Sequence, residues 1–323
     1  MLSFVDLVAE SKLPQVSDHI IYPWLLPGRL TLMCGPTEIG KTTLTLEIIA
    51  SALRGGHLWD RFPVRQIHKV LYLHAEHALA TVQDAARLRG DIPKECVQVV
   101  HDFGPDGAAL MKGGIPNVPL INSIRQTIVE VKPELIIAEP ISAFIGGDEN
   151  DNREARAVVS ILTDLASRAN AAILTHHHFG KSHFDPNHSR ATGIPTGEAR
   201  GAMAFEDAAE RVIYLRRMGE KEKGHIKVET PKSKGFPVSD VTLSFDEDTL
   251  SYSFVGNVKQ ERDLIAIYHR RRLYPSEPMR LLVDHFRSTW QCSPNKVYLM
   301  LKRAKRIGLL TETLPDPATV GAS

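Results

Sequence analysis

The sequence predicts an α/β fold with a mostly parallel β-sheet, followed by a small helical C-terminal domain. Short runs that are apolar throughout alternate with amphipathic stretches, which is typical of parallel strands covered by helices on both faces. A glycine-rich turn of the form G-x-x-x-x-G-K-[ST] stands between the first such strand and the first helix. From residue 259 onward, three short amphipathic patterns indicate a separate helical module.

The expected elements follow one another along the chain. Apolar runs predict strands at residues 29–35, 69–76, 96–100, 134–140 and 171–178. Helical patterns between them predict helices at residues 42–56, 120–132 and 152–170. After Gly201 the pattern changes to hairpin-like strands at residues 210–217, 224–235 and 241–256. We therefore expect a core with an N-terminal extension at residues 1–256, a second domain at 257–312 and a disordered tail at 313–323.

Composition excludes several classes of protein. Of the 323 residues, 43% are hydrophobic and 24% are charged, which is ordinary for a globular chain. The three cysteines lack metal-site spacing, so neither a disulfide framework nor a thiolate zinc site is predicted. No apolar run reaches the ~20 residues of a membrane span, and the N-terminus lacks the pattern of a signal peptide. These observations predict a cytoplasmic protein without membrane association.

Positive charge is concentrated near the C-terminus. Residues 259–311 hold 12 Lys and Arg against 4 Asp and Glu, whereas residues 1–258 hold 27 against 32. A compact basic module indicates a polyanionic partner. The alternative interpretation is a solvated helix face.

The segment GPTEIGKT, from Gly35 to Thr42, fits the phosphate-binding loop. Its glycines permit a tight turn, and amides of the loop and helix N-terminus bind phosphate oxygens. Lys41 is expected to reach the outer phosphates and the Thr42 hydroxyl to ligate Mg²⁺. The predicted ligand is ATP, bound by Gly35, Pro36, Thr37, Glu38, Ile39, Gly40, Lys41, Thr42 and Thr43.

Two glutamates end neighbouring apolar runs. Carboxylates at strand ends face the ligand crevice of a parallel sheet. Glu139 ends ELIIAEP, at the place where P-loop ATPases carry a magnesium-binding carboxylate, usually an Asp. Glu76 ends VLYLHAE and is the candidate for orienting and deprotonating the attacking water.

These segments resemble a known family. The chain looks like RecA-fold ATPases of the RepA-type hexameric replicative helicases, related to the DnaB group, over roughly residues 20–256. The resemblance rests on five blocks in the same order: GPTEIGKTT, VLYLHAEHA, LIIAEP, ILTHHHFGK and ARGAMAFEDAAERVIYLRR. It implies a RecA-like P-loop fold, Glu76 as the catalytic base and Glu139 in place of the family's magnesium-binding Asp.

The resemblance also bears on the run of three histidines that ends the strand at 171–178. In the family, a histidine pair at this strand end contacts the γ-phosphate or DNA, and its spacing falls on His177 and His178, so that His176 is extra. His178 is the preferred sensor residue. Alternation along a strand places His176 and His178 on one face and His177 on the other. A zinc site that adds His183 and His188 is an alternative, as is a structural run.

Further parts of the chain are expected to contact DNA. Residues 179–198 resemble the central loop of this fold, which binds single-stranded DNA, and Lys181 and Arg190 could meet phosphates there. Residues 259–311 look like a winged-helix domain whose third helix could bind duplex DNA. Winged helices also dock proteins, so that role stays open.

The function that follows is an ATP-hydrolysing motor on DNA, a replicative helicase of plasmid or phage type that acts as a homo-oligomeric, hexameric ring. A cation from the neighbouring subunit would complete the site, and Arg211 is the candidate, with Lys232 and Lys234 as alternatives. One rival is an ATP-switched DNA-binding regulator or loader without strand separation. The other, a small-molecule kinase, is disfavoured because no acceptor pocket is suggested.

Overall fold

The computed structural model of the 323-residue chain divides into two compact units, Met1–Val255 and Gly256–Ser323. It describes residues 16–76, 79–105, 107–148, 151–178, 204–218, 224–233, 240–255, 263, 266–267, 270–271, 274, 276–306 and 310. Each unit is considered by itself below.

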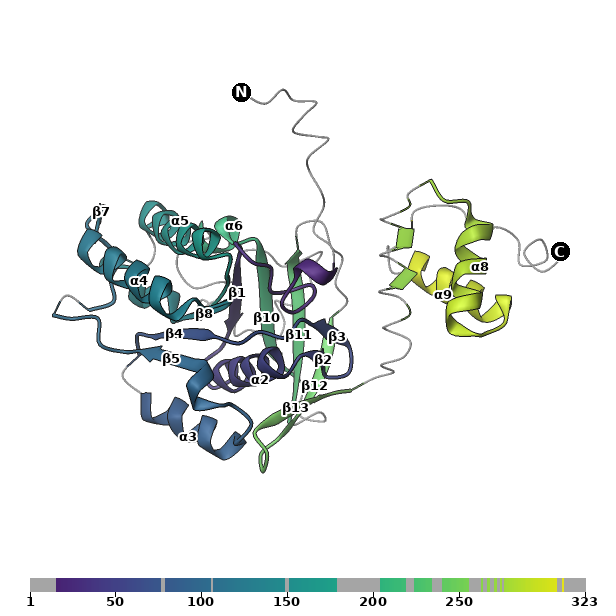
Figure 1. The fold of residues 1–323 in the computed structure, drawn as a ribbon, viewed down its shortest axis with the longest axis horizontal. Coiled ribbons are helices and arrows are strands. Elements are labelled where there is room, and N and C mark those ends of the chain that lie inside the picture. Colours follow the sequence, from purple (N-terminus) through teal and green to yellow (C-terminus); the bar gives the residue numbers. More distant parts are fainter. Residues whose placement is uncertain are drawn as a thin grey trace, which may run out of the picture. The chain divides into compact units, whose positions relative to one another are not determined.

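A nine-stranded sheet forms the centre of the first unit, in the order β13-β12-β11-β10-β1-β9-β8-β4-β5 (Figure 1). The strands from β10 to β5 in this order pair in parallel, and β11, β12 and β13 add antiparallel pairs at one edge. The strands are β1 Leu30–Gly35, β4 Val70–His74, β5 Val97–Val100, β8 Leu135–Glu139, β9 Ala172–His178, β10 Arg211–Arg217, β11 His225–Ser233, β12 Val241–Asp246 and β13 Ser251–Phe254. The mostly parallel α/β architecture that the sequence predicts is confirmed.

Helices cover both faces of the sheet. The helices are α2 Lys41–Arg54, α3 Leu79–Arg89, α4 Val118–Val131, α5 Asn152–Ala169 and α6 Ala204–Ala208. Side chains of α2 and α3 pack on one face of the sheet, and those of α4, α5 and α6 pack on the other. Two small hairpins accompany them, β2 Gly56–Leu58 with β3 Phe62–Val64, and β6 Met111–Lys112 with β7 Ile115–Pro116.

The helices differ in how they begin. Asn117 caps α4 by accepting from the Leu120 amide, and Asp151 caps α5 by accepting from the Arg153 and Glu154 amides. At α2 the cap residue is Gly40, which has no side chain to accept a bond and lies in the left-handed region at φ 95°. The first amides of α2 are therefore open to an external acceptor, as a phosphate site requires.

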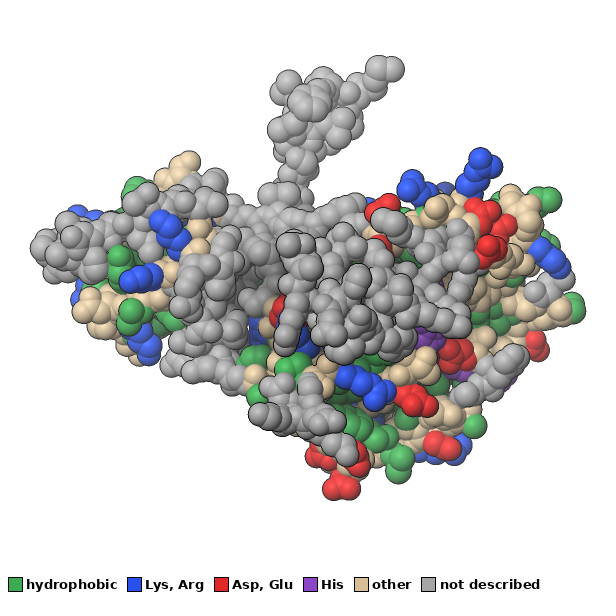
Figure 2. All heavy atoms as spheres, turned by 180° about the vertical axis from the view of Figure 1, so that it is seen from behind, with side chains coloured by type: hydrophobic (Ala, Val, Ile, Leu, Met, Phe, Trp, Pro, Cys, Tyr) green, Lys and Arg blue, Asp and Glu red, His purple; other side chains and the backbone are tan. Residues whose placement is uncertain are grey.

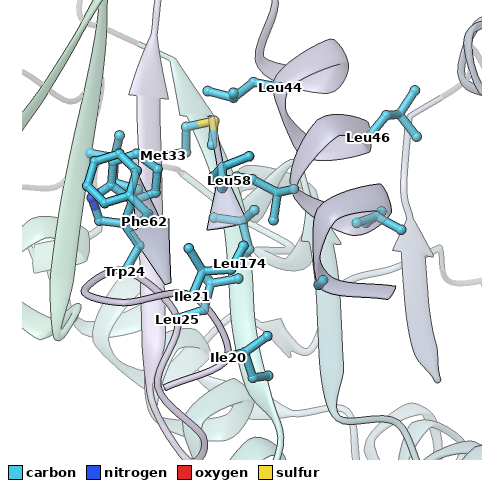
Figure 3. Close-up of a cluster of buried hydrophobic side chains, with 14 of the residues drawn as sticks. Ile20, Ile21, Trp24, Leu25, Met33, Leu44, Leu46, Leu58, Phe62 and Leu174 are labelled. Atoms are coloured by element: carbon cyan, nitrogen blue, oxygen red, sulfur yellow. The ribbon is translucent and has the colours of Figure 1, made fainter. Parts of the chain in front are cut away.

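The core on the α2 face is closed by aromatic side chains that precede and follow the first helix. Trp24, Trp59 and Phe62 form an aromatic cluster, in which the Trp24 and Phe62 ring centroids lie 4.5 Å apart. Figure 3 shows Trp24 and Phe62 close together in this core. The Thr31 hydroxyl donates to the Trp24 carbonyl, at 2.5 Å, and joins this cluster to the start of β1. The β2–β3 hairpin thereby packs against the strand that leads into the glycine-rich turn.

The second unit has a small core of its own. Helices α8 Met279–Trp290 and α9 Pro294–Arg306 pack through Leu282, Val283, Phe286, Val297, Met300, Leu301 and Ala304. Lys and Arg side chains are spread over the face of this unit that Figure 2 shows. Residues 307–309 and 311–313, which follow α9, lie outside the described residues, so the winged-helix assignment stays a prediction.

Within the described parts of both units, no helix is long and apolar enough to span a membrane.

The aromatic cluster generates a stability prediction. Phe62 is 1% exposed, and Phe62→Ala should lower the free energy of unfolding by about 3–5 kcal/mol because it removes a buried ring and leaves a cavity. Urea denaturation followed by circular dichroism measures the loss. The control is Val129→Ala on α4, where the side chain is 59% exposed and the change should stay within about 0.5 kcal/mol. Equal effects of the two substitutions would contradict the role given to the cluster.

Candidate nucleotide-binding site

The parallel strands bring their carboxyl ends to the same edge of the sheet. Register places Gly35 of β1 beside His178 of β9, and Glu139 of β8 beside His74 of β4. Ligands of open α/β sheets bind at this edge. The predicted P-loop and Glu139 therefore lie at the same edge of the sheet, although they are distant in sequence.

The turn between β1 and α2 has the backbone that a phosphate loop needs. Glu38 and Gly40 both have positive φ, at 60° and 95°. A Cβ at Gly40 would clash with the Tyr252 hydroxyl of β13, and a Cβ at Gly35 would lie 2.9 Å from Ile39. Both glycines are required for space, and Gly40 is also required for its conformation.

Lys41 is buried at the base of this turn. Its Nζ donates to the carbonyls of Gly35 and Pro36, at 3.1 and 2.9 Å, and lies 3.4 Å from Nδ1 of His178. Burial lowers the pKa of Lys41 to about 8, although the charges of Cys34, Glu76 and Glu139 oppose that shift. The ammonium group lacks a carboxylate partner within these contacts, and an anionic phosphate would supply the missing charge.

Glu139 is held in a buried network on the α2 face of the sheet. Tyr72 donates its hydroxyl to Oε1, His74 Nδ1 lies 3.5 Å from the same oxygen, and His176 Nδ1 contacts Oε2. Burial alone would raise the pKa of Glu139, but the charge and hydrogen bond of His176, with bonds from His74 and Tyr72, outweigh it. The pKa of Glu139 therefore lies well below the ordinary carboxyl value, and the group is ionised at neutral pH.

Thr42 and Glu139 suit Mg²⁺ by their donor chemistry. Mg²⁺ takes hard oxygen ligands. The Thr42 side chain is half-buried at the second residue of α2, and the Glu139 carboxylate is ionised at the end of β8. The residues present thus fit the ion that the loop predicts.

The other predicted site residues differ in the exposure of their side chains and in the face of the sheet on which they lie. Glu76 follows β4 and is exposed, as a residue that must reach a water molecule would be. His178 faces Lys41, whereas His177 packs on the opposite face against Phe205, with ring centroids 4.9 Å apart. His176 and His178 therefore share a face, as strand alternation predicts.

The structure does not support the prediction that Arg211 supplies a cation to the site of a neighbouring subunit. It begins β10 beside Thr31 of β1, at the strand starts, so it lies at the edge of the sheet opposite the P-loop. Its side chain is 0% exposed, and its Nη2 lies 3.4 Å from Nε2 of His19. A cation that acts on a neighbouring subunit must be exposed to it, so this geometry does not support Arg211. The side chain of Lys232 and the whole of Lys234 lie outside the described residues.

Sequence reasoning missed several residues that the structure brings to the site. Arg217 ends β10, is exposed, and donates to the P-loop carbonyls of Thr37 and Glu38, at 3.4 and 3.2 Å. Tyr72 and His74 reach Glu139, and Tyr252 reaches Gly40. Tyr72 and His74 lie two residues apart in β4, so strand alternation places both side chains on one face of the sheet. That alternation is the sequence signal for these two residues, although their contact with Glu139 depends on the pairing of β4 with β8.

The zinc alternative depends on residues that the structure does not describe. Within the described ranges, no group of three or more His, Cys, Asp or Glu is arranged to hold a metal ion. His183 and His188, and the expected DNA-binding loop at 179–198, lie outside those ranges.

Comparison with known proteins agrees with this geometry. Residues 2–183 match the family described as "AAA domain". The chain is similar in structure to the solved "ATPase Domain of G40P", with a TM-score of 0.52 and 13% sequence identity over 71% of this chain and 85% of that one. No curated protein matches the sequence. The structural likeness supports the RecA-like P-loop fold.

The lowered pKa of Lys41 predicts that nucleotide binding takes up a proton. At pH 8 the free site holds this lysine about half neutral, whereas bound phosphate favours the charged form, so binding should take up about half a proton. Above pH 8 the affinity should fall by about tenfold per pH unit. Titration calorimetry in buffers of different ionisation enthalpy, at pH 6.5 and pH 8, measures the uptake. Lys41→Met corrects for protons bound by the nucleotide itself, and equal uptake by the two proteins at pH 8 would contradict the assignment.

Proposed function

The chain belongs to the AAA domain family of P-loop ATPases, and on this premise we propose that it is an ATP-hydrolysing motor that acts on DNA as a replicative helicase of plasmid or phage type. The observation that carries the ATPase part is the position of Lys41, at the start of α2, at the edge of the sheet where Glu139 and His178 end the adjacent strands β8 and β9. The helicase part rests on the sequence blocks shared with RepA-type helicases and on the basic second unit.

Hydrolysis is proposed as in-line attack of water on the γ-phosphate, with positioning and charge neutralisation as the main sources of rate. Glu76 orients and deprotonates the water. Lys41 leaves its carbonyl contacts for the outer phosphates, and His178, 3.4 Å from its Nζ, senses the γ-phosphate. Thr42 and Glu139 hold Mg²⁺, which when bound neutralises developing charge on the phosphate oxygens.

The proposed DNA contacts come from two parts of the chain. Residues 179–198 follow β9, which ends in the histidines beside Lys41, so a loop there is connected directly to the proposed phosphate sensor. The second unit carries exposed Lys296, Lys302 and Lys305 on α9, which suit a polyanion. We further propose a hexameric ring in which Lys232 or Lys234, rather than Arg211, reaches the neighbouring site.

An ATP-switched DNA-binding regulator or loader is the second candidate. The observation in its favour concerns Glu139, at the position where RepA-type helicases have a shorter Asp. Glu139 is 3% exposed, and its carboxylate oxygens already contact Tyr72 and His176. A carboxylate held in this way suits binding and slow turnover. Strand displacement on a forked DNA substrate separates the two candidates, since a helicase releases the displaced strand with ATP and a switch does not.

The catalytic assignment predicts separate effects at two residues. Lys41→Ala should abolish ATP hydrolysis, whereas Glu76→Gln should retain ATP binding and lose about 10²–10⁴-fold in turnover, the usual range for a general base. Phosphate release and equilibrium nucleotide binding measure the two effects. If Glu76→Gln hydrolyses ATP at a near wild-type rate, the base assignment is wrong and Glu139 becomes the candidate.

The proposed DNA-binding role of the basic second unit predicts how the affinity for DNA depends on salt concentration. Removing residues 259–323 should leave a folded ATPase, because the first unit has hydrophobic cores of its own. DNA binding should weaken and the slope of log affinity against log salt should become shallower, because fewer phosphates are neutralised. Fluorescence anisotropy at several salt concentrations gives both quantities. An unchanged affinity and slope would assign this unit to protein docking.

A further inference from the structure

The three histidines at the end of β9 have different surroundings, and His176 contacts both the β8 carboxylate and the P-loop helix. Its Nδ1 contacts Glu139 Oε2, and its Nε2 lies 2.6 Å from the Thr45 hydroxyl of α2. Its side chain is buried, as are those of Thr45 and Glu139. The imidazole therefore bridges two elements that carry expected ligands of Mg²⁺.

The position of this bridge follows from sheet register. Ala138 pairs with Thr175, so the next residues, Glu139 and His176, lie side by side at the ends of β8 and β9. Alternation points both side chains toward α2 rather than α5. The residue that is extra to the family's histidine pair is thus the one whose side chain reaches the carboxylate.

Thr45 lies one helical turn beyond Thr42 on α2. Residues three apart on a helix are neighbours on its surface, so fixing Thr45 also limits the position of Thr42. The contact between His176 and Thr45 therefore restrains the helix that carries Thr42 relative to the Glu139 carboxylate. A Glu has one more methylene than the Asp expected at this position and needs such restraint, because its side chain has an additional rotatable bond.

We propose that His176 is a positioning residue that clamps Glu139 and, through Thr45, couples it to the P-loop helix, so that Thr42 and Glu139 form one magnesium site. The proposal rests on the proposed ATPase function and deepens it. Tyr72 holds the other carboxylate oxygen, so Glu139 is restrained through both oxygens and keeps lone pairs for the ion or its waters. His176 does not touch the nucleotide in this role.

The two contacts of His176 can be removed separately. Thr45→Val removes the hydroxyl and keeps the shape. His176→Asn keeps a polar group near the position of Nδ1 and loses the contact of Nε2 with Thr45, whereas His176→Leu loses both contacts. Thr31→Val is the matched control, because Thr31 is also a buried threonine with a hydrogen bond, to the Trp24 carbonyl, but it lies at the strand starts.

The experiment measures binding of a fluorescent, non-hydrolysable ATP analogue against Mg²⁺ concentration and in EDTA. Loss of a group that orients a metal ligand typically costs 10–100-fold in metal affinity. His176→Leu should therefore raise the half-saturating Mg²⁺ concentration by about 10–100-fold, with binding in EDTA unchanged within about threefold. Thr45→Val and His176→Asn should show smaller, similar increases, and their combination should add little because they break the same bond.

Two results would overturn the proposal. One is an unchanged Mg²⁺ dependence in folded His176→Leu, and the other is an equal loss of binding in EDTA and in Mg²⁺, which indicates a structural role. If His176→Leu does not fold, Thr45→Val decides, and a Mg²⁺ dependence like that of Thr31→Val overturns the coupling. Failure of the proposed function has a different signature, in which the wild-type chain does not bind the analogue at all.

Discussion

The parallel pairing of the central strands is the constraint on which the rest of this structure depends. Because parallel strands all end at one edge, this pairing brings the P-loop after β1, Glu139 of β8 and the histidines of β9 to the same edge of the sheet. The same polarity excludes Arg211, which begins its strand. Burial on both faces favours partners for polar groups at that edge, and Glu139 accordingly lies in a network with Tyr72 and His176 rather than in solvent.

Much of the fold could be predicted from the sequence, because its parallel strands are apolar throughout and each lies within a residue or two of the run that predicts it. Helix α3 could not, since none of its residues is buried and its apolar pattern is weak. The β2–β3 hairpin was missed because its three-residue strands are too short to show alternation. Both lie where tertiary packing, rather than local pattern, decides the structure.

The candidate site likewise contains residues that could be predicted from the sequence and contacts that could not. The phosphate loop is local in sequence, so its residues could be assigned from spacing alone. The contacts of Glu139 depend on which strands are neighbours and in what register, information that the sequence alone does not carry. The contacts of Tyr72 and Arg217 are of this kind. The position of Arg211 in a block that resembles the family likewise does not show at which edge of the sheet it lies. The histidine run combines both kinds of information. Alternation along the strand predicts the face of the sheet on which each histidine lies, whereas the contacts of His176 are found only in the three-dimensional structure.

The contact between Tyr252 and Gly40 affects which residues position 40 can accept. A side chain at position 40 is opposed by the left-handed backbone and also by a hydroxyl contributed from the far end of the sheet. Relieving the second obstacle by changing Tyr252 leaves the first, and no single substitution removes both. Position 40 is therefore restricted to glycine by two independent constraints, and replacing Tyr252 would not by itself make another residue acceptable there.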